Sequence, residues 1–181
     1  MRIAIRNTAA ALAVAFLAVP LGALADDDDE KDEAKGHEEL SRAMKDAKVP
    51  LDRGIATAAG KESTAISAKY EVEDGKLQLS VYTMKGDKFS EVIVDHKTGK
   101  VAKSEPITSG EDLTAARAQR EALAQAKRSL ASATTAATKA NPGYYAVSAL
   151  PRLEEGHPVA AVTLLKGSDW KTVSERLDSA Q

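Results

Sequence analysis

The sequence contains no cysteine, and aromatic residues make up only 4% of its 181 residues. Without cysteine the chain forms no disulfide bond, even in an oxidising compartment. Because large aromatic side chains are scarce, the core must be built from Ala, Val, Leu and Ile, which favours small modules over one deep core. The stability of the fold therefore depends on packing alone.

Motifs that carry chemistry are also absent. The three histidines, His37, His96 and His157, do not have the spacing of metal ligands and are interpreted as exposed polar residues, two of them in turns. No Gly-x-Ser-x-Gly nucleophile motif and no glycine-rich phosphate loop occurs. We therefore expect no catalytic, cofactor-binding or metal-binding residues, and we expect that the protein is not an enzyme.

The first 25 residues are typical of a bacterial secretory signal peptide. Arg2 and Arg6 precede an apolar stretch over residues 8–19, and Ala23 and Ala25 occupy the two positions that signal peptidase reads. The apolar stretch is shorter than the roughly 20 residues that a membrane-spanning helix needs. We expect cleavage after Ala25, which would place the mature protein in the periplasm or outside the cell without a membrane span.

Residues 26–36 are dominated by Asp and Glu. Because these residues repel one another and bury nothing, the segment is predicted to be a disordered acidic arm. It would serve as a solvating tail or, alternatively, capture cations or basic partners weakly. The rest of the chain is nearly neutral, so we expect no binding of nucleic acid.

The chain carries an internal repeat. Residues 43–51 align with residues 122–130 at a separation of 79, and residues 65–86 align with residues 146–167 at a separation of 81. Order and spacing are both kept, which favours duplication over chance similarity. We therefore divide the chain into a first repeat over residues 37–106 and a second over residues 107–181.

Each repeat is predicted to consist of one or two helices followed by a three-stranded antiparallel sheet, which is an α+β fold. In the first repeat, helices are expected over 38–48 and 52–59, and strands over 65–72, 77–82 and 89–94. In the second, helices are expected over 112–126 and 130–139, and strands over 145–153, 159–165 and from residue 170 onward.

Seven residues are predicted to shape the turns: Asp74, Gly75, Gly86, Asp95, Gly99, Gly156 and Gly167. Asp74-Gly75 between two alternating strands is a strong hairpin signal, because the turn that fits the strand twist needs positive φ angles. The carboxylate of Asp95 can accept hydrogen bonds from the backbone of its own turn. These polar positions therefore serve the fold.

The motifs Val49-Pro50-Leu51-Asp52, Glu73-Asp74-Gly75-Lys76-Leu77 and Val92 to Val101 resemble the PepSY domain family. The most specific part is the ending, in which an alternating apolar strand is followed by Asp95, two variable residues and Thr-Gly-Lys-Val. The resemblance covers residues 49–103 and extends to 129–178 through the internal repeat. There the motif is degenerate, because Val173 to Asp178 keeps an Asp and lacks Thr-Gly-Lys-Val.

The resemblance implies small helix-and-sheet modules that occur in protease propeptides and in periplasmic proteins, with a proposed role in binding or inhibiting proteases. We expect a binding or regulatory module that pairs an extended peptide, such as a segment of an envelope protein or protease, with the first or third strand of either repeat. The alternative is a structural or stress-related envelope protein that acts through self-association. Trp170 would anchor the core or contact a partner.

Overall fold

A computed structural model describes the backbone of residues 27–179 and the side chains of residues 34–179. The predicted signal peptide, including Ala23 and Ala25, lies outside the described residues. The helices are α1 (Asp27–Ala43), the short 3-10 helix η1 (Met44–Asp46), α2 (Leu51–Ala59), α3 (Gly110–Ala122) and α4 (Leu130–Ala140). The strands are β1 (Thr64–Glu73), β2 (Lys76–Lys85), β3 (Lys88–Val94), β4 (Val101–Ile107), β5 (Tyr145–Glu154), β6 (His157–Lys166) and β7 (Asp169–Arg176).

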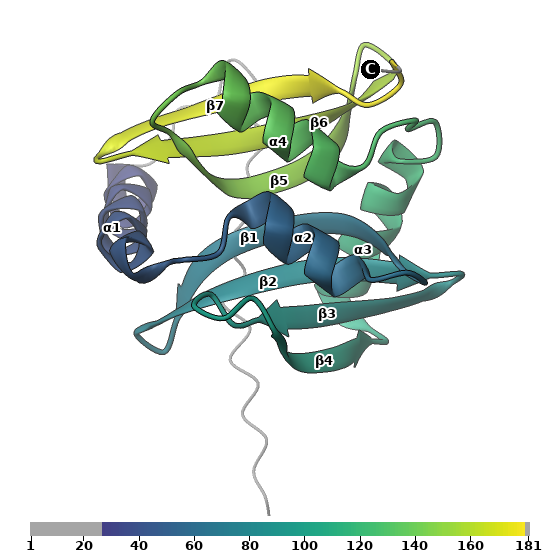
Figure 1. The fold of residues 1–181 in the computed structure, drawn as a ribbon, viewed down its shortest axis with the longest axis horizontal. Coiled ribbons are helices and arrows are strands. Elements are labelled where there is room, and N and C mark those ends of the chain that lie inside the picture. The colour runs from purple at the N-terminus through teal and green to yellow at the C-terminus, as the bar shows by residue number, and fades with distance from the viewer. Residues whose placement is uncertain (1–26, 180–181) are drawn as a thin grey trace, which may run out of the picture.

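The strands form one antiparallel sheet in the order β4-β3-β2-β1-β5-β6-β7 (Figure 1). The predicted α+β class is thus confirmed. The expectation of two separate three-stranded sheets is wrong, because β1 and β5 pair with each other and because β4 adds a fourth strand to the first half. Strand β4 escaped prediction since six of its seven residues are exposed, which leaves no alternating apolar pattern to read.

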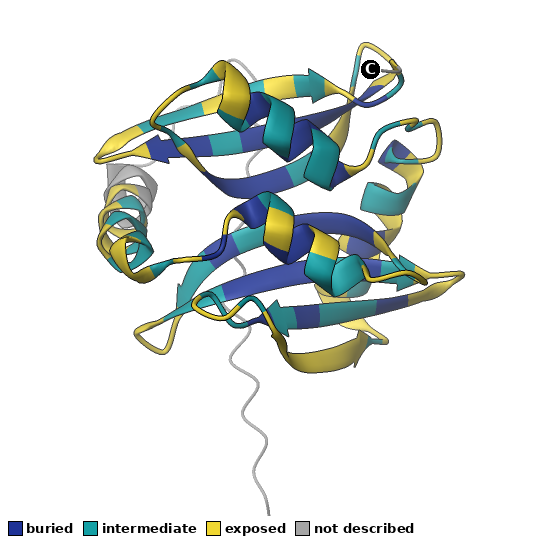
Figure 2. Cartoon of the chain, in the orientation of Figure 1, coloured by how far each residue is buried: buried dark blue, intermediate teal, exposed yellow. Residues whose placement is uncertain are grey.

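Helices α2 and α4 lie side by side on one face of the sheet (Figure 1). Leu51 and Ile55 of α2 and Leu130 of α4 are buried against the strands, together with Ala133 and Ala137. Small alanine side chains let α4 approach the sheet closely, which suits a core with few aromatic residues. The central strands are accordingly the most buried part of the molecule (Figure 2).

Helix α3 packs on the opposite face, behind the sheet in the view of Figure 1. Ala116 of α3 forms a second, smaller cluster with Ile66 of β1 and Phe89 of β3. The guanidinium of Arg120 lies 5.7 Å from the centre of the Phe89 ring and also pairs with Asp87 at 2.9 Å. The helix that follows the first half in sequence thus covers strands of that same half.

The acidic segment 26–36, which the sequence predicts to be disordered, is helical from Asp27 onward. Carboxylates near a helix N-terminus interact favourably with the helix dipole, and a prediction from like-charge repulsion alone does not include this effect. Farther along α1, Arg42 pairs with Glu38 one turn earlier at 3.2 Å. No helix in the described part of the chain has the length and apolar composition that crossing a membrane requires.

Candidate functional site

The open edge of the sheet at β7 is the candidate site. The sequence offered the first and third strands of both repeats, which are β1, β3, β5 and β7, as docking edges. The structure pairs β3 with β4 over most of its length and pairs β1 with β5 at Ala68 and Lys69. Strand β7 pairs with β6 from Asp169 to Arg176, and its other side has no neighbouring strand among residues 27–179 (Figure 1). Its outward backbone groups can therefore pair with another chain.

Strand β4 forms the opposite edge and is less suited to pairing. Pro106 lacks a backbone N–H and interrupts the row of donors that an added strand would use. The exposed side chains of Lys103 and Glu105 form an ion pair with each other at 2.8 Å. Strand β7 has no proline.

The side chains of β7 alternate between two environments. Val173 lies opposite Val162 and packs on the main core, and its neighbours Lys171 and Glu175 are half-buried on the same face. Thr172 and Ser174, which point to the other face, are exposed. The strand thus presents one mixed face beside α4 and one polar face.

Aromatic and charged side chains gather at the start of β7. The Tyr144 hydroxyl donates a hydrogen bond to Asp169, and this bond raises the pKa of the tyrosine. The Lys171 ammonium lies 4.0 Å from the centre of the Tyr144 ring. The Trp170 ring stacks on His37 of α1, with the ring centres 4.1 Å apart and the planes inclined by 12°. Trp170, which the sequence left as either a core anchor or a partner contact, is half-buried here.

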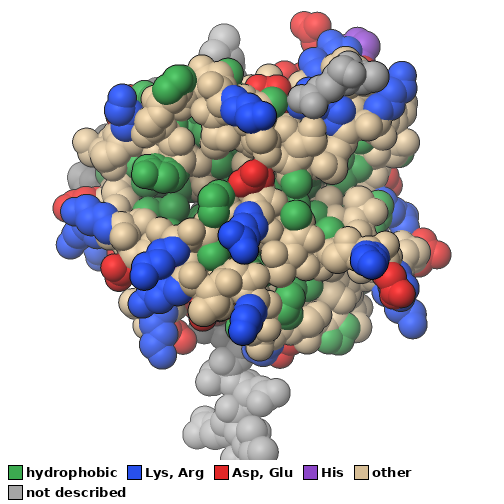
Figure 3. Space-filling model, viewed as in Figure 1, with side chains coloured by type: hydrophobic (Ala, Val, Ile, Leu, Met, Phe, Trp, Pro, Cys, Tyr) green, Lys and Arg blue, Asp and Glu red, His purple; other side chains and the backbone are tan. Residues whose placement is uncertain are grey.

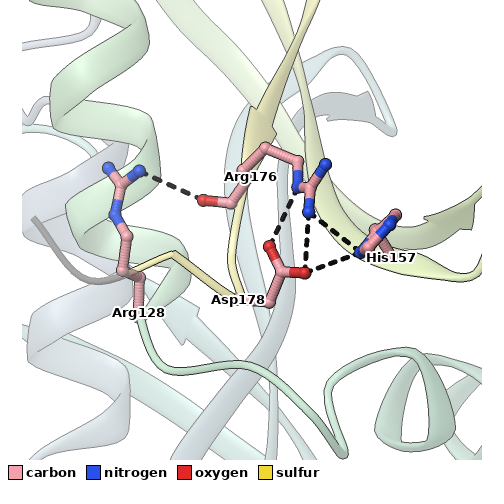
Figure 4. A network of polar contacts seen from close by, with 4 residues as sticks. All are labelled: Arg128, His157, Arg176 and Asp178. Atoms are coloured by element: carbon pink, nitrogen blue, oxygen red, sulfur yellow. Dashed lines mark hydrogen bonds and ion pairs between the residues drawn. The ribbon is translucent and has the colours of Figure 1, made fainter.

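An ionic network closes the other end of β7 (Figure 4). Asp178 accepts two hydrogen bonds from Arg176, both at 2.9 Å, and contacts Nδ1 of His157 at 2.8 Å. Arg176 and then His157 hold the pKa of Asp178 well below its usual range. Beside the network is an open hollow of about 500 Å³, lined by Glu154, Glu155, His157, Val159 and Arg176.

Arg128 ties the end of β7 to the start of α4. Its Nη1 donates to the backbone carbonyl of Arg176 at 3.1 Å and lies 3.9 Å from the Glu175 carboxylate. The Arg128 side chain is only 11% exposed. Its Nε and Nη2 atoms are buried without a hydrogen-bond partner among the described residues, so burying this guanidinium costs stability.

A second polar cluster lies under α3. Lys69 and Glu71 of β1 pair at 2.6 Å, and the hydroxyl of buried Ser80 donates to Glu71 at 2.7 Å. Burial, together with the charge of Glu71, raises the pKa of Glu91 on β3, although Ser80 and Lys69 act in the opposite direction. The adjoining cavity of about 130 Å³ includes Ser67, whose hydroxyl donates to Gln119 of α3 at 2.8 Å.

Neither cluster has the composition of a metal centre. Within the part of the chain that the structure describes, no group of three or more His, Cys, Asp or Glu side chains could hold a metal ion. On the helix-covered face, Lys and Arg side chains gather toward the left edge of the view, and acidic side chains lie among the other basic ones (Figure 3). The geometry of the β7 edge, with free backbone groups and flanking aromatic rings, fits contact with another polypeptide.

The predicted turn residues are distributed among separate turns and do not converge. Asp74 and Gly75 have φ angles of 50° and 71°, as the hairpin needs. The remaining glycines, Gly86, Gly99, Gly156 and Gly167, have positive φ angles too. Asp95 accepts hydrogen bonds from the N–H groups of Lys97 at 3.0 Å and Thr98 at 2.6 Å, and the Thr98 bond is the main reason for its lowered pKa.

The residue of the second half that corresponds to Asp95 is Arg176, which the sequence motif does not reveal. The degenerate ending of the second repeat suggests Asp178 as the counterpart of Asp95. In the structure, however, the carbonyls of His96 and Leu177 correspond, because each accepts hydrogen bonds from two backbone N–H groups of the segment before a helix. This match places Arg176 at the position of Asp95. The separation of 81 residues, applied to the end of the repeat, would have given the same answer.

Comparisons with known proteins add little to this geometry. No family model matches the chain, and no curated protein matches it. Among solved structures, the chain is similar to a crystal structure described as a "putative lipoprotein" from Clostridium difficile 630. The identity is 15%, the match covers 75% of this chain and 91% of the other, and the TM-score is 0.40. A likeness this distant identifies neither family nor function.

Proposed function

We propose that the protein is a non-catalytic binding module of the bacterial envelope that captures an extended segment of a partner chain along β7. The observation that carries the proposal is the outer side of β7, which has no neighbouring strand among the described residues, whereas β1, β3 and β5 each have a strand on both sides. Backbone hydrogen bonds to an added strand would supply affinity, and the flanking side chains would supply specificity. Inhibition of an envelope protease would be one use of such binding, as the PepSY-like motifs suggest.

The envelope location rests on the sequence of the first 25 residues, with Arg2 and Arg6 before the apolar stretch and Ala23 and Ala25 at its end. The absence of cysteine is compatible with this location, since a chain without thiols is indifferent to an oxidising compartment. The proposal predicts that an expressed full-length chain is exported and begins at Asp26. N-terminal sequencing of the protein from a periplasmic extract tests it, and an intact Met1 terminus would contradict it.

We propose further that the chain consists of two PepSY-like repeats that arose by duplication. Matching irregularities support this reading. The β1–β2 pairing has a bulge between Ala65 and Ser67, and the β5–β6 pairing has one between Ala146 and Ser148, 81 residues later. Bulges are specific features of a fold, so their coincidence at aligned positions favours common descent.

The turns and backbone contacts agree with the same alignment. Asp74 has a φ of 50°, and Glu155, which lies 81 residues later, has a φ of 51°. The N–H groups of residues 48 and 49 bind the carbonyl of His96, and those of residues 127 and 128 bind that of Leu177. These pairs keep separations of 79 before the loop and 81 after it, as the sequence repeat does.

The test is a titration of the chain with a synthetic octapeptide of alternating Val and Thr, flanked by Lys for solubility. Trp170 is the only tryptophan and lies on β7, so its fluorescence reports binding at this edge. We expect saturable binding that is lost when alternate amides of the peptide are N-methylated, because strand addition needs those N–H groups. The methylated peptide is the matched control, since the protein itself is unchanged.

Equal binding of the methylated peptide would overturn the proposal. A comparison of two proline variants gives a second test, with Val173→Pro in β7 and Ser104→Pro in β4. If the fluorescence change on peptide binding is retained in full by Val173→Pro and is lost in Ser104→Pro, the proposal is also overturned. Circular dichroism of both variants shows that each retains its sheet before the titration is interpreted.

A further inference from the structure

We infer that the strand captured by β7 is β7 of a second copy of this chain, paired antiparallel about a twofold axis at Val173. The inference rests on the proposed function of this edge and names its partner. It would join two seven-stranded sheets into one continuous sheet across the axis. An interface of this type is isologous, since both copies contribute the same surface.

The sequence of β7 is complementary to its own reverse. Pairing about Val173 sets Lys171 opposite Glu175 of the other copy, and this pair of opposite charges occurs twice. Thr172 then faces Ser174, which can exchange hydroxyl hydrogen bonds. Trp170 faces Arg176, a cation placed against an aromatic ring. Each of these cross-strand combinations is favourable in antiparallel sheets.

Other registers do not offer this match. A twofold axis perpendicular to the sheet keeps the helix-covered faces of both copies on one side, so residues opposite each other must share a face. The alternative registers are then obtained by moving the twofold axis from Val173 to a neighbouring residue of β7. Moving the axis to Thr172 sets Asp169 opposite Glu175, which are like charges, and moving it to Ser174 sets Val173 opposite Glu175.

The charged side chains of this strand reach solvent in part, and each also has a contact within its own chain. The side chain of Arg176 is 52% exposed, and that of Glu175 is 23% exposed. Glu175 lies 3.9 Å from Arg128, and Lys171 lies over the Tyr144 ring at 4.0 Å. Turning Glu175 toward a second copy moves its carboxylate away from Arg128, whose side chain is only 11% exposed, so the two pairs between the copies must offset that loss.

The molecule already contains a contact of the same kind. At the centre of its sheet, β1 and β5 meet edge to edge and antiparallel, with Ala68 opposite Ala149. These two residues are 81 positions apart and thus equivalent in the repeat. Pairing of β7 with itself would repeat this arrangement between chains. Growth would stop there, because the outer edges would both be β4 strands that carry Pro106.

Sedimentation velocity across a concentration series tests the inference. We expect the wild-type mass to rise from one chain toward two as concentration increases. Lys171→Glu sets Glu against Glu175 twice and Glu175→Lys sets Lys against Lys171 twice, so each variant alone should remain a monomer. The matched control, Lys103→Glu on β4, should associate like the wild type.

Mixing the two monomeric variants provides the decisive result. Lys171→Glu and Glu175→Lys complement each other at both pairs, so an equimolar mixture should recover the two-chain species, as should the double variant K171E/E175K. Variants that stay monomeric when mixed, although circular dichroism shows them folded, would overturn the inference. Association of Lys171→Glu alone or of Glu175→Lys alone to the same extent as the wild type would also overturn the inference.

The outcome is separable from that of the proposed function. A wild-type chain that remains a monomer up to millimolar concentration, yet binds the Val-Thr octapeptide with loss on N-methylation, excludes the second copy and leaves strand capture standing. A chain that neither associates nor binds the peptide contradicts both.

Discussion

Ala68 of β1 and Ala149 of β5 face each other at the centre of the sheet, where the two halves of the chain meet. They lie 81 positions apart, which is the separation at which residues 65–86 align with residues 146–167. Their side chains are 3% and 0% exposed, because α2 and α4 cover this seam. Small residues here let two helices and two strands approach one another closely.

The first prediction concerns this seam. Ala68→Val and Ala149→Val each add volume to a filled site and should each lower the free energy of unfolding by about 1–3 kcal/mol. Since the two residues are in contact, the double variant should deviate from the sum of the singles by more than about 0.5 kcal/mol. Urea unfolding followed by circular dichroism measures the effect. The control, Ala102→Val on exposed β4, should change stability by less than about 0.5 kcal/mol.

The second prediction concerns a close contact between α2 and β2. A Cβ atom added at Gly54 would lie 2.4 Å from Cδ2 of Leu79, so Gly54→Ala should destabilise the chain by about 1–3 kcal/mol. Leu79→Ala alone should cost about 2–5 kcal/mol, because it leaves a cavity. The second half has two alanines, Ala133 and Ala160, at the corresponding buried positions.

The double variant G54A/L79A recreates the combination of the second half. We expect it to cost clearly less than the sum of the two single changes, since the added methyl occupies space that the leucine vacates. Thermal and urea unfolding measure the three variants side by side. Strict additivity would show that the two positions do not share one packing site.

The third prediction concerns a buried hydroxyl. Tyr70 donates a hydrogen bond to the backbone carbonyl of Val49, and Tyr70→Phe leaves that carbonyl without its partner, at a cost of about 1–3 kcal/mol. Burial also raises the pKa of Tyr70 in the folded state. Because the pKa of Tyr70 is higher in the folded state, its contribution to the free energy of unfolding is complete below the pKa of tyrosine in the unfolded chain, about 10. The contribution is lost as the pH rises further. Urea unfolding at pH 8 and above pH 10 should therefore show a smaller decline for Y70F than for the wild type.

The fourth prediction concerns the carboxyl group under α3. The pKa of Glu91 is raised by burial and by Glu71, so the folded state holds this proton more tightly than the unfolded state does. The charged form therefore costs stability above the folded pKa, and that cost disappears as the pH falls toward the unfolded value of about 4.3. Glu91→Gln should stabilise the chain at pH 7 and lose this advantage as the pH approaches 4.3.

Thermal unfolding between pH 4 and pH 8 checks the Glu91 prediction. The exposed carboxylate of Glu105 provides the matched control, since Glu105→Gln removes the same charge without relieving a burial cost. A parallel pH profile for E91Q and the wild type would contradict the assignment of the cost to this residue.

The fifth prediction concerns the contact between α1 and β7. His37→Ala removes the ring that stacks on Trp170, so the indole should gain contact with water. We expect the tryptophan emission to shift to longer wavelength, with no change in far-ultraviolet circular dichroism. The control, Glu38→Ala, changes the neighbouring exposed residue and should leave the emission unchanged.

The sequence predicted well those elements whose signals are local. Alternation in β2 and the Asp74-Gly75 turn depend on neighbouring residues, and β1 and β2 pair on either side of that turn. The pairing of β1 with β5 depends on contacts between distant residues, and no local pattern encodes it. The exposed strand β4 has no apolar periodicity and was missed for the same reason.

The candidate site could be predicted only in part. The proposal of strand edges followed from the hairpin pattern, but the choice of β7 needed the order of strands in space. Similarly, His157 and Glu154 are far from Arg176 in sequence, and both are common residue types, so no local pattern predicts that they meet at the end of β7. The helical start of α1 shows how a run of like charges can misdirect, because charge density alone does not include the helix dipole.

The placement of α1 and α3 makes the two halves mutually dependent. Helix α3 opens the second half in sequence but shields Ile66 and Phe89 of the first, while α1 opens the first half and reaches Trp170 of the second. A cut in the linker at residues 108–109 would therefore not release two independent domains. The second fragment would carry α3, which covers Ile66 and Phe89 of the first, so the two should reassemble into one particle when mixed and remain poorly folded when kept apart.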